Sequence, residues 1–515
     1  MELTPSSILL FTIVIVILHN LGVRIKKIRQ GTKLNHSKPN LPPGPWKLPI
    51  IGSLHHMAGS LPHRALRDLA KKYGPLMHLQ LGEVSTVVVS SPELAKEVLR
   101  THDINFASRP EILAIKILFY NCTDIAFSPY GEYFTQLRKI CMQELFSVKK
   151  VQTFQWLRKE ESLRLMGWIA SKAGSPINLT QQLSALTYST ISRAAFGKTC
   201  RAHERFLEVA REAIYLADGF KLADIFPSFT FLHSISGTTA KLEKMHRETD
   251  TILENIIAEH REAARNTNRI SEASEDVIDV LLKFENRDDQ GFCLSTSNIK
   301  AVIFDLFAGG GESAAATLDW TVAEMIKHPR ILEKAQAEVR QVFDESQGEV
   351  REEGLEKLQY MKSVLKETLR LHTPAPLLLP RVAAERCEIN GFDIPKKARV
   401  IVNAWAIGRD PAYWKEPETF NPDRFLGNPI EFLGNSFEYI PFGAGRRICP
   451  GMNFGLATLE YQLAMLLYHF DWKLPHGLKN EDVDMTELFG PAVKRKHDLY
   501  LIPTPYRPSQ SNKHD

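Results

Sequence analysis

Cysteine is scarce in this chain, and its spacing excludes two common classes of protein. Only six cysteines occur in 515 residues, and no two of them stand at the short spacing of a zinc-binding pair. The pattern is not a disulfide framework either, so a disulfide-stabilised secreted domain and a cysteine-rich zinc domain are both excluded. The scattered cysteines indicate a reducing compartment.

The chain also lacks a strong excess of charge. Its 64 basic and 60 acidic residues leave a net charge of +4, which is too small to predict binding to nucleic acid. It has no dinucleotide or flavin fingerprint, so electrons for any redox reaction must come from a separate protein. No internal repeat appears. The composition that remains, 44% hydrophobic and 24% charged, is that of an ordinary globular protein.

Long apolar runs are equally rare, with one exception at the amino terminus. Leu3 to Val23 spans 21 residues, close to the roughly 20 that a bilayer helix needs. A cleaved signal peptide is the alternative, but no basic segment precedes the run and no small-x-small site follows it. Five basic residues follow between Arg24 and Lys33 instead. The positive-inside rule then predicts a retained single-pass anchor in membrane lipid, with the rest of the chain on the cytosolic face.

Prolines separate this anchor from the body. The segment Pro39 to Pro45 contains four of them, which deny the chain a helix and predict a semi-rigid spacer. We therefore divide the chain into an anchor (3–23), a basic and proline-rich hinge (24–45), one large domain (46–505) and a polar tail (506–515).

Helical patterns dominate the body, and strand patterns are few. Runs of β-branched residues on both sides of Gly82-Glu83 predict one hairpin, from Met77 to Leu81 and from Ser85 to Ser90. The predicted helices are 92–101, 132–145, 154–173, 181–196, 241–265, 297–327, 360–372 and 452–468. The predicted fold class is mainly α with small β-sheets.

One cysteine stands apart from the other five. Cys449 lies in PFGAGRRICPG, from Pro441 to Gly451, directly before the last predicted helix. Glycines let the backbone approach a flat group closely, and the two arginines and the helix N-terminus favour a thiolate. With no second cysteine nearby, a haem iron suits this thiolate better than zinc. A lone cysteine is otherwise usually a small buried hydrophobic residue, so the surrounding loop carries the prediction.

The pattern Phe442-x-x-Gly445-x-Arg447-x-Cys449-x-Gly451 resembles the haem-ligand loop of the cytochrome P-450 family. The resemblance implies the P-450 fold, haem b (iron protoporphyrin IX) and O2 as co-substrate. Cys449 would be the axial ligand of the haem iron, and an axial thiolate favours cleavage of the O–O bond. Phe442 and Gly443 would border the cysteine, and Arg447 would pair with a haem propionate.

The resemblance also implies two further propionate partners, Arg138 and Arg381. The segment Tyr130 to Cys141 is similar to a family helix that carries Trp-x-x-x-Arg along one edge of the haem. Arg138 stands in the arginine place, while Phe134 replaces the tryptophan. Because Phe134 has no indole N–H to donate, one hydrogen bond worth about 1–2 kcal/mol should be missing.

Three consecutive glycines, Gly309 to Gly311, interrupt the helical pattern of 297–327, at roughly 1 kcal/mol each relative to alanine. A phosphate-binding loop is the first alternative, but the run has neither of the usual glycine-rich spacings. Missing side chains would instead let a flat ring and a diatomic ligand approach the helix. The family has Ala/Gly-Gly-x-Asp/Glu-Thr here, which implies that Glu312 connects solvent to the site and that the Ser313 hydroxyl organises protons. Taken alone, Glu312 could equally be a surface carboxylate.

Glu367 and Arg370 share one face of a predicted helix. Such a pair is usually a surface salt bridge worth under about 1 kcal/mol. In the family it joins a later arginine, here Arg424, in a buried triad that holds the cysteine loop. The resemblance also implies an apolar substrate pocket, in which Leu377 and Ala492 could equally be ordinary core residues. The candidate pocket residues are Ala308, Leu377, Leu378, Phe489 and Ala492.

These features predict a haem-thiolate monooxygenase anchored in the endoplasmic reticulum membrane and reduced by NADPH through a separate flavoprotein, NADPH-cytochrome reductase. Runs such as LPHRALRDLAKKYGPLMHLQLGE resemble plant microsomal members that oxidise terpenoids, which implies an apolar sesquiterpenoid or diterpenoid substrate. Alkaloid or phenolic precursors are alternative substrates. Two other functions remain open: reductase-independent rearrangement of hydroperoxides, and a non-catalytic haem sensor or carrier.

Overall fold

The computed structural model describes residues 39–197, 201–216, 222–228, 237–266, 275–285, 292–346, 348–475 and 477–507. The predicted anchor lies outside these residues, as do most of the predicted hinge and most of the predicted tail. Within the described ranges, no helix has both the length and the apolar character that crossing a bilayer requires.

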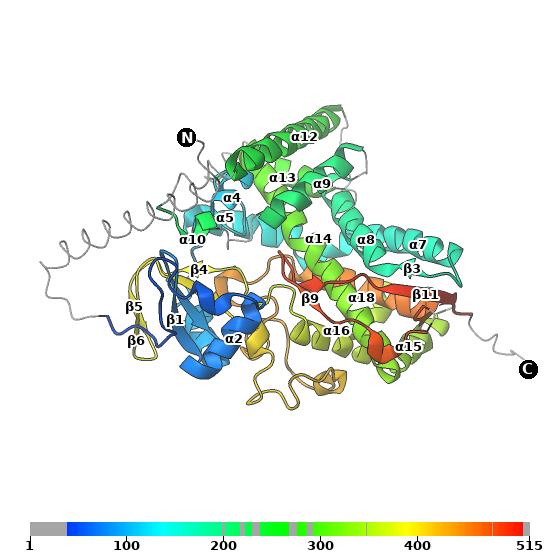
Figure 1. The fold of residues 1–515 in the computed structure, drawn as a ribbon. Coiled ribbons are helices and arrows are strands. Elements are labelled where there is room, and N and C mark those ends of the chain that lie inside the picture. Colours follow the sequence, from blue (N-terminus) through cyan, green and yellow to red (C-terminus); the bar gives the residue numbers. More distant parts are fainter. Residues whose placement is uncertain are drawn as a thin grey trace, which may run out of the picture.

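Helices make up most of the described chain (Figure 1). The longer ones are α2 (Pro62–Tyr73), α5 (Glu132–Ile140), α7 (Gln155–Ser171), α8 (Leu179–Phe196), α9 (Arg201–Leu216), α12 (Thr238–Asn266), α14 (Thr296–Lys327), α15 (Pro329–Asp344), α16 (Gln359–Leu371) and α18 (Met452–His469). The shorter ones are α3 (Pro92–Lys96), α4 (Leu113–Leu118), α6 (Val148–Thr153), α10 (Leu222–Ile225), α13 (Val277–Leu282) and α17 (Ala404–Ile407). Single turns of 3₁₀ or π type are η1 (Leu54–Met57), η2 (Glu97–Thr101), η3 (Cys141–Leu145), η6 (Glu352–Lys357), η7 (Pro422–Phe425), η8 (Gly445–Arg447) and η9 (Asn480–Asp482).

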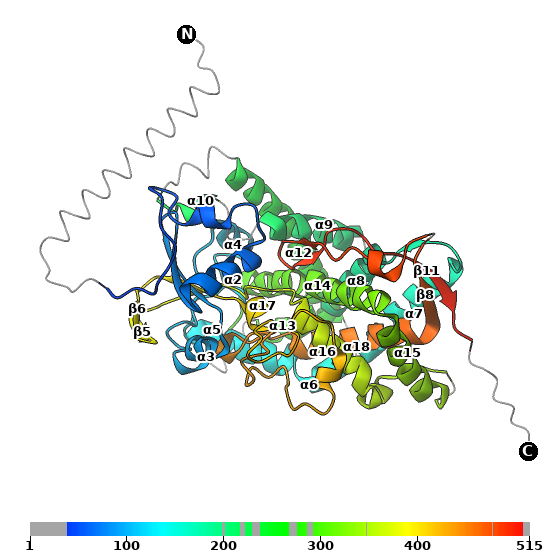
Figure 2. The ribbon, with the colours of Figure 1, turned by 60° about the horizontal axis from the view of Figure 1, so that its bottom comes forward.

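In the described ranges the strands form four small sheets. Their bounds are β1 (Leu76–Leu81), β2 (Val84–Val89), β3 (Ile177–Asn178), β4 (Arg381–Val382), β5 (Cys387–Ile389), β6 (Phe392–Ile394), β7 (Arg399–Val402), β8 (Phe470–Lys473), β9 (Glu487–Leu488), β10 (Lys494–Arg495) and β11 (Tyr500–Pro505). The largest sheet has the order β1-β2-β7-β4, a second has β3-β11-β8, and β5-β6 and β9-β10 are pairs. The four-stranded sheet and the three-stranded sheet lie at opposite ends of the molecule (Figures 1 and 2).

The hairpin predicted around Gly82-Glu83 is confirmed. β1 and β2 pair antiparallel from Leu76↔Val89 to Leu81↔Val84, and Gly82 takes φ +57° at the turn. The predicted mainly helical class is also confirmed. Two predicted helices, 92–101 and 132–145, begin as α-helices and end in a wider π-type turn, η2 and η3.

α14 runs through the centre of the molecule in both views (Figures 1 and 2). Ser295 begins it with a capping box, because its side chain accepts from the N–H of Asn298 and the Asn298 side chain accepts in return. The helix then packs against α8, α9, α16 and α18. It can lie at the centre because apolar residues surround its axis, among them the fully buried Phe304, Leu318 and Trp320.

The described part of the predicted hinge lies against the body. The carbonyl of Pro43 accepts from the N–H of His78 at 2.8 Å, and Asn40 exchanges hydrogen bonds with Asp393 beside the β5-β6 pair. A Cβ at Gly44 would overlap the carbonyl of His78, so glycine is required for this close approach. Residues 39–45 therefore begin the folded domain.

The glycine run of α14 serves helix packing more than ligand access. A Cβ at Gly311 would come closer than 3.0 Å to the ring of Tyr188 on α8, and one at Gly310 would lie 2.8 Å from Ile191. At Gly309 nothing lies within 4 Å. Only Gly309 thus faces open space, and the expectation that all three glycines admit a flat ring is corrected to this one position.

We predict opposite effects for two alanine substitutions in this run. Gly311→Ala should destabilise the fold by about 1–3 kcal/mol, because the added methyl forces α8 and α14 apart. Gly309→Ala, the matched control, should be neutral or stabilising by roughly 0.5–1 kcal/mol, since alanine is the better helix former. Urea unfolding followed by circular dichroism measures both. Equal midpoints for the two variants would contradict the packing role of Gly311.

Candidate active site

The cysteine loop is built around a turn that only glycine permits. Gly445 takes φ +69°, and a Cβ there would overlap the carbonyl of Leu99 and reach 2.8 Å from the carboxylate of Asp103. The single turn η8 follows, and the N–H of Cys449 donates to the carbonyl of Phe442 at 2.9 Å. The loop closes on itself and presents Cys449 directly before α18, as the sequence indicated.

The charge that acts on Cys449 comes from Arg138, not from its neighbours in the sequence. Burial raises the pKa of the Cys449 thiol, and the N–H of Gly451 and the guanidinium of Arg138 lower it in part. Arg138 also donates to the carbonyl of Ile448 at 2.7 Å, within the cysteine loop. The expectation that Arg446 and Arg447 supply this charge is therefore corrected.

Arg447 points away from the sulfur and into the protein. Its guanidinium donates to the carbonyls of Ala107 (2.6 Å), Ile125 (3.1 Å) and Ser128. The same guanidinium lies 3.6 Å from the ring centroid of Phe134. Phe134 is thus a stacking partner of Arg447.

Four arginines converge beside the loop: Arg381 and Arg447 are buried, and Arg109 and Arg138 are partly buried. Burial, together with the charges of Arg381 and Arg138, lowers the pKa of Arg447 to about 9. Burial and the other three arginines likewise hold the pKa of Arg109 well below its usual value. Arg381 has a partial counter-charge in Asp103, at 3.0 Å. Such a concentration of buried positive charge requires anions, which the two propionates of a haem would provide.

Arg109 was not found by sequence reasoning, and nothing in its surroundings marks it. It stands in a loop, before Pro110, and no helical or strand pattern includes it. In the structure it donates to the carbonyls of Ala126 (3.0 Å), Leu379 (2.7 Å) and Pro380 (3.0 Å). It therefore joins two segments that are far apart in the sequence.

The middle of α14 borders open space. Residues 299–304 and 315–326 are buried, but most positions from 305 to 314 are partly exposed and Gly309 is exposed, although the helix is central. The hydroxyl of Ser313 donates to the carbonyl of Gly309 at 2.6 Å. The open stretch of α14 thus presents the Ser313 hydroxyl next to Gly309, which has no side chain.

Glu312 lies in a polar cluster contributed by four elements. Its carboxylate accepts from Lys494 of β10 (2.7 Å), Tyr215 of α9 (2.9 Å) and Tyr188 of α8 (3.4 Å). Burial alone raises the pKa of Glu312, but the bonds to Lys494 and Tyr215 outweigh it, so the pKa is lowered. Glu312 is therefore an ionised, paired carboxylate. Sequence reasoning did not find Lys494 or Tyr215, which no local pattern connects to α14.

The candidate pocket residues fall into two groups. Ala308 is partly buried on the open stretch of α14, and Leu378 (φ +50°) lies beside the cysteine loop, where its Cδ1 would be 3.8 Å from a Cβ at Gly443. Leu377 and Ala492 are buried in packed clusters, as ordinary core residues would be. Phe489 is partly buried with its ring 6.2 Å from that of His63. That Phe489 lines a substrate pocket stays a prediction.

The structure brings Glu367, Arg370 and Arg424 together. Glu367 and Arg370 are fully buried with an N–O distance of 2.7 Å, and Arg424 reaches the same carboxylate at 3.0 Å. Arg370 also donates to the carbonyls of Gly408 and Pro417. The three charges therefore join α16 to the chain before the cysteine loop.

An aromatic cluster connects this triad to the cysteine loop. It contains Trp414, Phe425 and Tyr439, with Phe442 packed against it. The guanidinium of Arg370 lies 5.3 Å from the centroid of Trp414, and the hydroxyl of Tyr439 donates to a carbonyl of α16 at 2.8 Å. The triad therefore supports the aromatic cluster, and the cluster in turn holds Phe442, the first residue of the haem-loop pattern.

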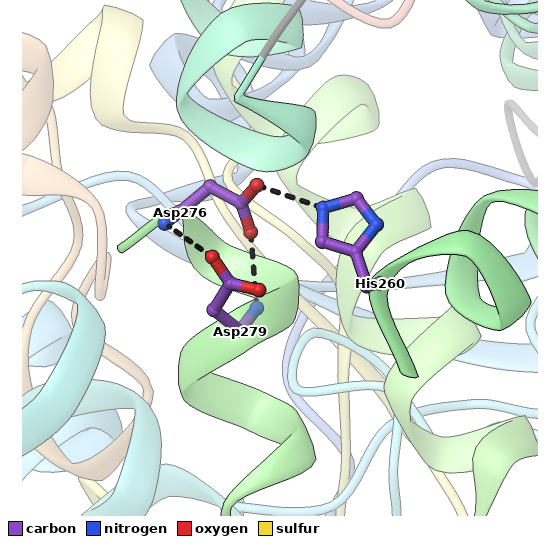
Figure 3. A group of neighbouring side chains, drawn as sticks. All are labelled: His260, Asp276 and Asp279. Carbon is purple, nitrogen blue, oxygen red and sulfur yellow. Dashed lines mark hydrogen bonds and ion pairs between the residues drawn. The ribbon is translucent and has the colours of Figure 1, made fainter. Parts of the chain in front are cut away.

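Among the described residues, His260, Asp276 and Asp279 form one other group with side chains close enough to hold a metal ion (Figure 3). Its geometry is that of a helix cap. Asp276 and Asp279 form the capping box of α13, and His260 Nε2 lies 2.8 Å from Asp276. His260 Nδ1 lies 2.8 Å from the carbonyl of Ile256. Both ring nitrogens thus face acceptors, which favours a doubly protonated imidazolium with no lone pair for a metal.

The chain matches the family model described as Cytochrome P450 over residues 42–501. The donor set described above fits the haem-thiolate class of protein: one loop cysteine, a group of buried and partly buried arginines and an open stretch of central helix. The chain belongs to the cytochrome P450 family, and it is a monooxygenase of that family. The fold and the family expected from the cysteine loop are confirmed.

Three curated plant relatives are similar over almost their whole length. Premnaspirodiene oxygenase of Hyoscyamus muticus is 52% identical over 94% of this chain and 96% of its own length. 5-Epiaristolochene 1,3-dihydroxylase of Nicotiana tabacum is 51% identical over 94% and 96%. Desmethyl-deoxy-podophyllotoxin synthase of Sinopodophyllum hexandrum is 50% identical over 92% and 93%. The predicted resemblance to plant members that act on terpenoids is confirmed.

Among solved structures, a zebra fish cytochrome P450 with progesterone has a similar fold. The TM-score is 0.74 at 24% identity, and the match covers 87% of this chain and all of that one. At this identity the similarity shows the shared fold alone.

We predict that Glu367→Ala abolishes haem binding. The substitution leaves two arginines buried without their carboxylate, which typically costs about 3–5 kcal/mol, and the aromatic cluster behind the cysteine loop loses its support. The ferrous carbonyl spectrum per mole of purified protein measures haem content. Asp423→Ala is the matched control, because the nearby Asp423–Lys334 pair (2.7 Å) is more than half exposed and should contribute under about 1 kcal/mol. Full haem content in Glu367→Ala would refute the prediction.

The His260 cluster predicts a pH-dependent link between α12 and α13. Burial lowers the pKa of His260, but the bond to Asp276 outweighs it and raises the pKa to about 9. The stabilisation is therefore complete below the ordinary value of 6.5 and is lost as the pH rises to about 9, up to roughly 3 kcal/mol. The protection factors of the α13 amides against hydrogen exchange, which are corrected for the intrinsic effect of pH on exchange, should fall across this window in the wild type. In His260→Gln the change should disappear, and an unchanged profile would contradict this assignment.

Proposed function

We propose that this protein uses NADPH, through a separate flavoprotein reductase, to hydroxylate an apolar sesquiterpenoid or diterpenoid at the endoplasmic reticulum membrane. The observation that carries the substrate class is the identity of just over half, across almost the entire chain, to two relatives named for oxidising premnaspirodiene and 5-epiaristolochene. Reductase dependence is supported by the lack of a dinucleotide or flavin motif in the sequence.

The residues of the site support a role for each part. Haem, when bound, supplies the activation of O2 at an iron held by a thiolate. Cys449 would provide that thiolate, and Arg138, Arg381 and Arg447 would bind the propionates. The Ser313 hydroxyl, held at the carbonyl of Gly309, places a transferable proton at the open stretch of α14. We keep Ser313 and Glu312 as the candidate catalytic residues.

Glu312 would act from its ion pair. Glu312 is the residue before Ser313 on α14. Its carboxylate is ionised and bound to Lys494. A carboxylate in this place can accept a proton from solvent and pass it toward Ser313, which suits delivery of protons to a reaction of O2. This argues against the hydroperoxide-rearranging alternative and against a haem carrier, since neither needs proton delivery.

One relative favours the second candidate substrate class, which is phenolic or alkaloid precursors. Desmethyl-deoxy-podophyllotoxin synthase is 50% identical, nearly as similar as the two terpenoid relatives. Overall identity therefore does not separate the two classes here. The pocket residues that would separate them, such as Ala308 and Leu378, are small or aliphatic, which suits a hydrocarbon skeleton better than a polar aromatic one.

Membrane attachment is part of the proposal. Its support is the apolar run Leu3 to Val23 followed by basic residues, the usual pattern of an anchor whose following domain stays in the cytosol.

Microsomes that contain this chain and a plant NADPH-cytochrome reductase should convert a terpene hydrocarbon to a product with one added oxygen atom. The panel should hold sesquiterpenes, diterpenes, phenolic and alkaloid precursors, and lipid hydroperoxides, each supplied with isotopically labelled O2. Mass spectrometry then reports whether the label enters the product. Cys449→Ser is the matched control, and it should lose both the turnover and the haem-thiolate carbonyl spectrum.

Three results would overturn parts of the proposal. Turnover of a phenolic or alkaloid precursor alone would replace the substrate class. Turnover of a hydroperoxide without NADPH would replace the reaction. Recovery of the intact chain outside the membrane fraction would remove the anchor from the proposal.

A further inference from the structure

Most of the main-chain carbonyls that accept hydrogen bonds from Arg447 belong to a short loop packed on α14. Two of the three are those of Ile125 and Ser128, in the segment Asp124–Ser128. The position of Arg447 therefore depends on what fixes this loop. The loop is joined to the central helix by two acidic residues, Asp124 within it and Asp305 on α14.

Asp305 accepts the main chain of the loop directly. Its Oδ2 receives the N–H groups of Ile125 at 2.7 Å and Ala126 at 3.2 Å. Asp124 supports the same turn from inside, because its Oδ2 accepts from the N–H of Phe127 at 2.8 Å. Each carboxyl group thus uses one oxygen to bind backbone donors of the loop.

The two carboxyl groups therefore bind three consecutive backbone N–H groups of one turn and lie side by side. Asp124 is fully buried, and its Oδ1 receives a hydrogen bond from no N–H or O–H donor among the described residues. The carboxyl groups of Asp305 and Asp124 lie within hydrogen-bonding contact of each other. Two carboxylates in this position would repel each other, and one carboxylic acid beside one carboxylate would bind.

We propose that Asp305 and Asp124 share one proton, and that this acid–carboxylate pair is a positioning device that fixes the loop Asp124–Ser128 and, through it, the propionate-binding side chain of Arg447. Neither residue needs to touch the reacting atoms. The pair acts on the haem site through the main-chain carbonyls of the loop. The sequence contains no signal for it, because the two acids are remote in the chain and belong to unrelated patterns.

The surrounding groups support a proton in this place. Burial and the neighbouring Asp124 raise the pKa of Asp305 well above its ordinary value, and burial raises that of Asp124 to about 6. The groups that face the pair from neighbouring elements are Arg447, Arg109, Tyr133, Cys141 and Cys122. The two arginines act on Asp124, so it is the ionised member and Asp305 is the acid.

The backbone just before the loop Asp124–Ser128 is strained, so other contacts must hold it in place. Tyr120, Asn121 and Cys122 take φ values of +49°, +60° and +57°, three consecutive left-handed residues with no glycine among them. Such a run is strained and persists only where other contacts impose it. The hydroxyl of Tyr120, bound to Asp250 at 2.9 Å, holds its near end. The acid pair holds its far end.

The sign of the pH dependence follows from the raised pKa values. The acid–carboxylate pair is intact at neutral pH. Asp124 takes up a proton below about pH 6, and at alkaline pH Asp305 loses its proton, so that two negative charges face each other and the pair fails. The loop should then release Arg447.

The test uses purified holoenzyme and needs neither substrate nor reductase, so its outcome is independent of the proposed terpenoid activity. Infrared difference spectroscopy at neutral pH should show the carbonyl stretch of a buried protonated carboxylic acid, and Asp305→Asn should remove that band. Haem transfer to apomyoglobin should accelerate at alkaline pH in the wild type. Asp305→Asn keeps an acceptor for the backbone and gives a permanent donor to Asp124, so it should abolish the acceleration.

Two further variants complete the design. Asp305→Ala removes the acceptor of two backbone N–H groups, so haem transfer should become at least about tenfold faster at every pH. Asp344→Asn, an acid on α15 that accepts from Tyr468 and Tyr506, is the control and should leave both readouts unchanged. Absence of the band from the wild type would show that both acids are ionised beside the arginines and would overturn the proposal. Retention of the alkaline acceleration in Asp305→Asn would overturn it as well.

Discussion

Buried arginines that bind main-chain carbonyls are the interaction on which this structure depends most. Arg447 joins the cysteine loop to Ala107, Ile125 and Ser128, and Arg370 joins α16 to Gly408 and Pro417. Guanidinium has five donors in a rigid plane, so one side chain can fix several irregular segments at once. A cysteine loop without regular secondary structure could not otherwise keep one geometry.

This arrangement has an electrostatic consequence. Arg109 and Arg447 donate to main-chain carbonyls, yet the charges of Arg138 and Arg381 still lower the pKa values of both. The protein has therefore placed more positive charge at the site than its own acids neutralise. A ligand with two carboxylates, as haem has, would relieve this repulsion, so its binding would stabilise the folded site. The acid pair of Asp124 and Asp305 belongs to the same balance, because an extra full negative charge there would compete for Arg447.

Local chemistry explains which features could be predicted from the sequence. The helix α18 and the hairpin of β1 and β2 follow from periodicity and turn residues, and both lie within a residue or two of their predicted bounds. The loop of Cys449 was recognisable because glycine, arginine and cysteine stand in one short segment. By contrast, the partners of Glu312 come from α8, α9 and β10, and only the folded chain brings them together. Gly310 and Gly311 were misread for the same reason, since their role depends on α8.

Phe134 shows how such a distant contact changes an interpretation. The sequence predicts a loss there, because phenylalanine lacks the indole N–H that the family pattern uses. In the structure its ring stacks on the guanidinium of Arg447 at 3.6 Å. A desolvated cation–π contact contributes about 1–2 kcal/mol, the same as the hydrogen bond that is missing. If Arg447 binds a propionate as proposed, Phe134 would replace a direct bond to the cofactor by a contact that holds the arginine in place. Because Arg447 is also held by the loop that Asp305 fastens, the site can tolerate the change at position 134 only while that loop stays in place.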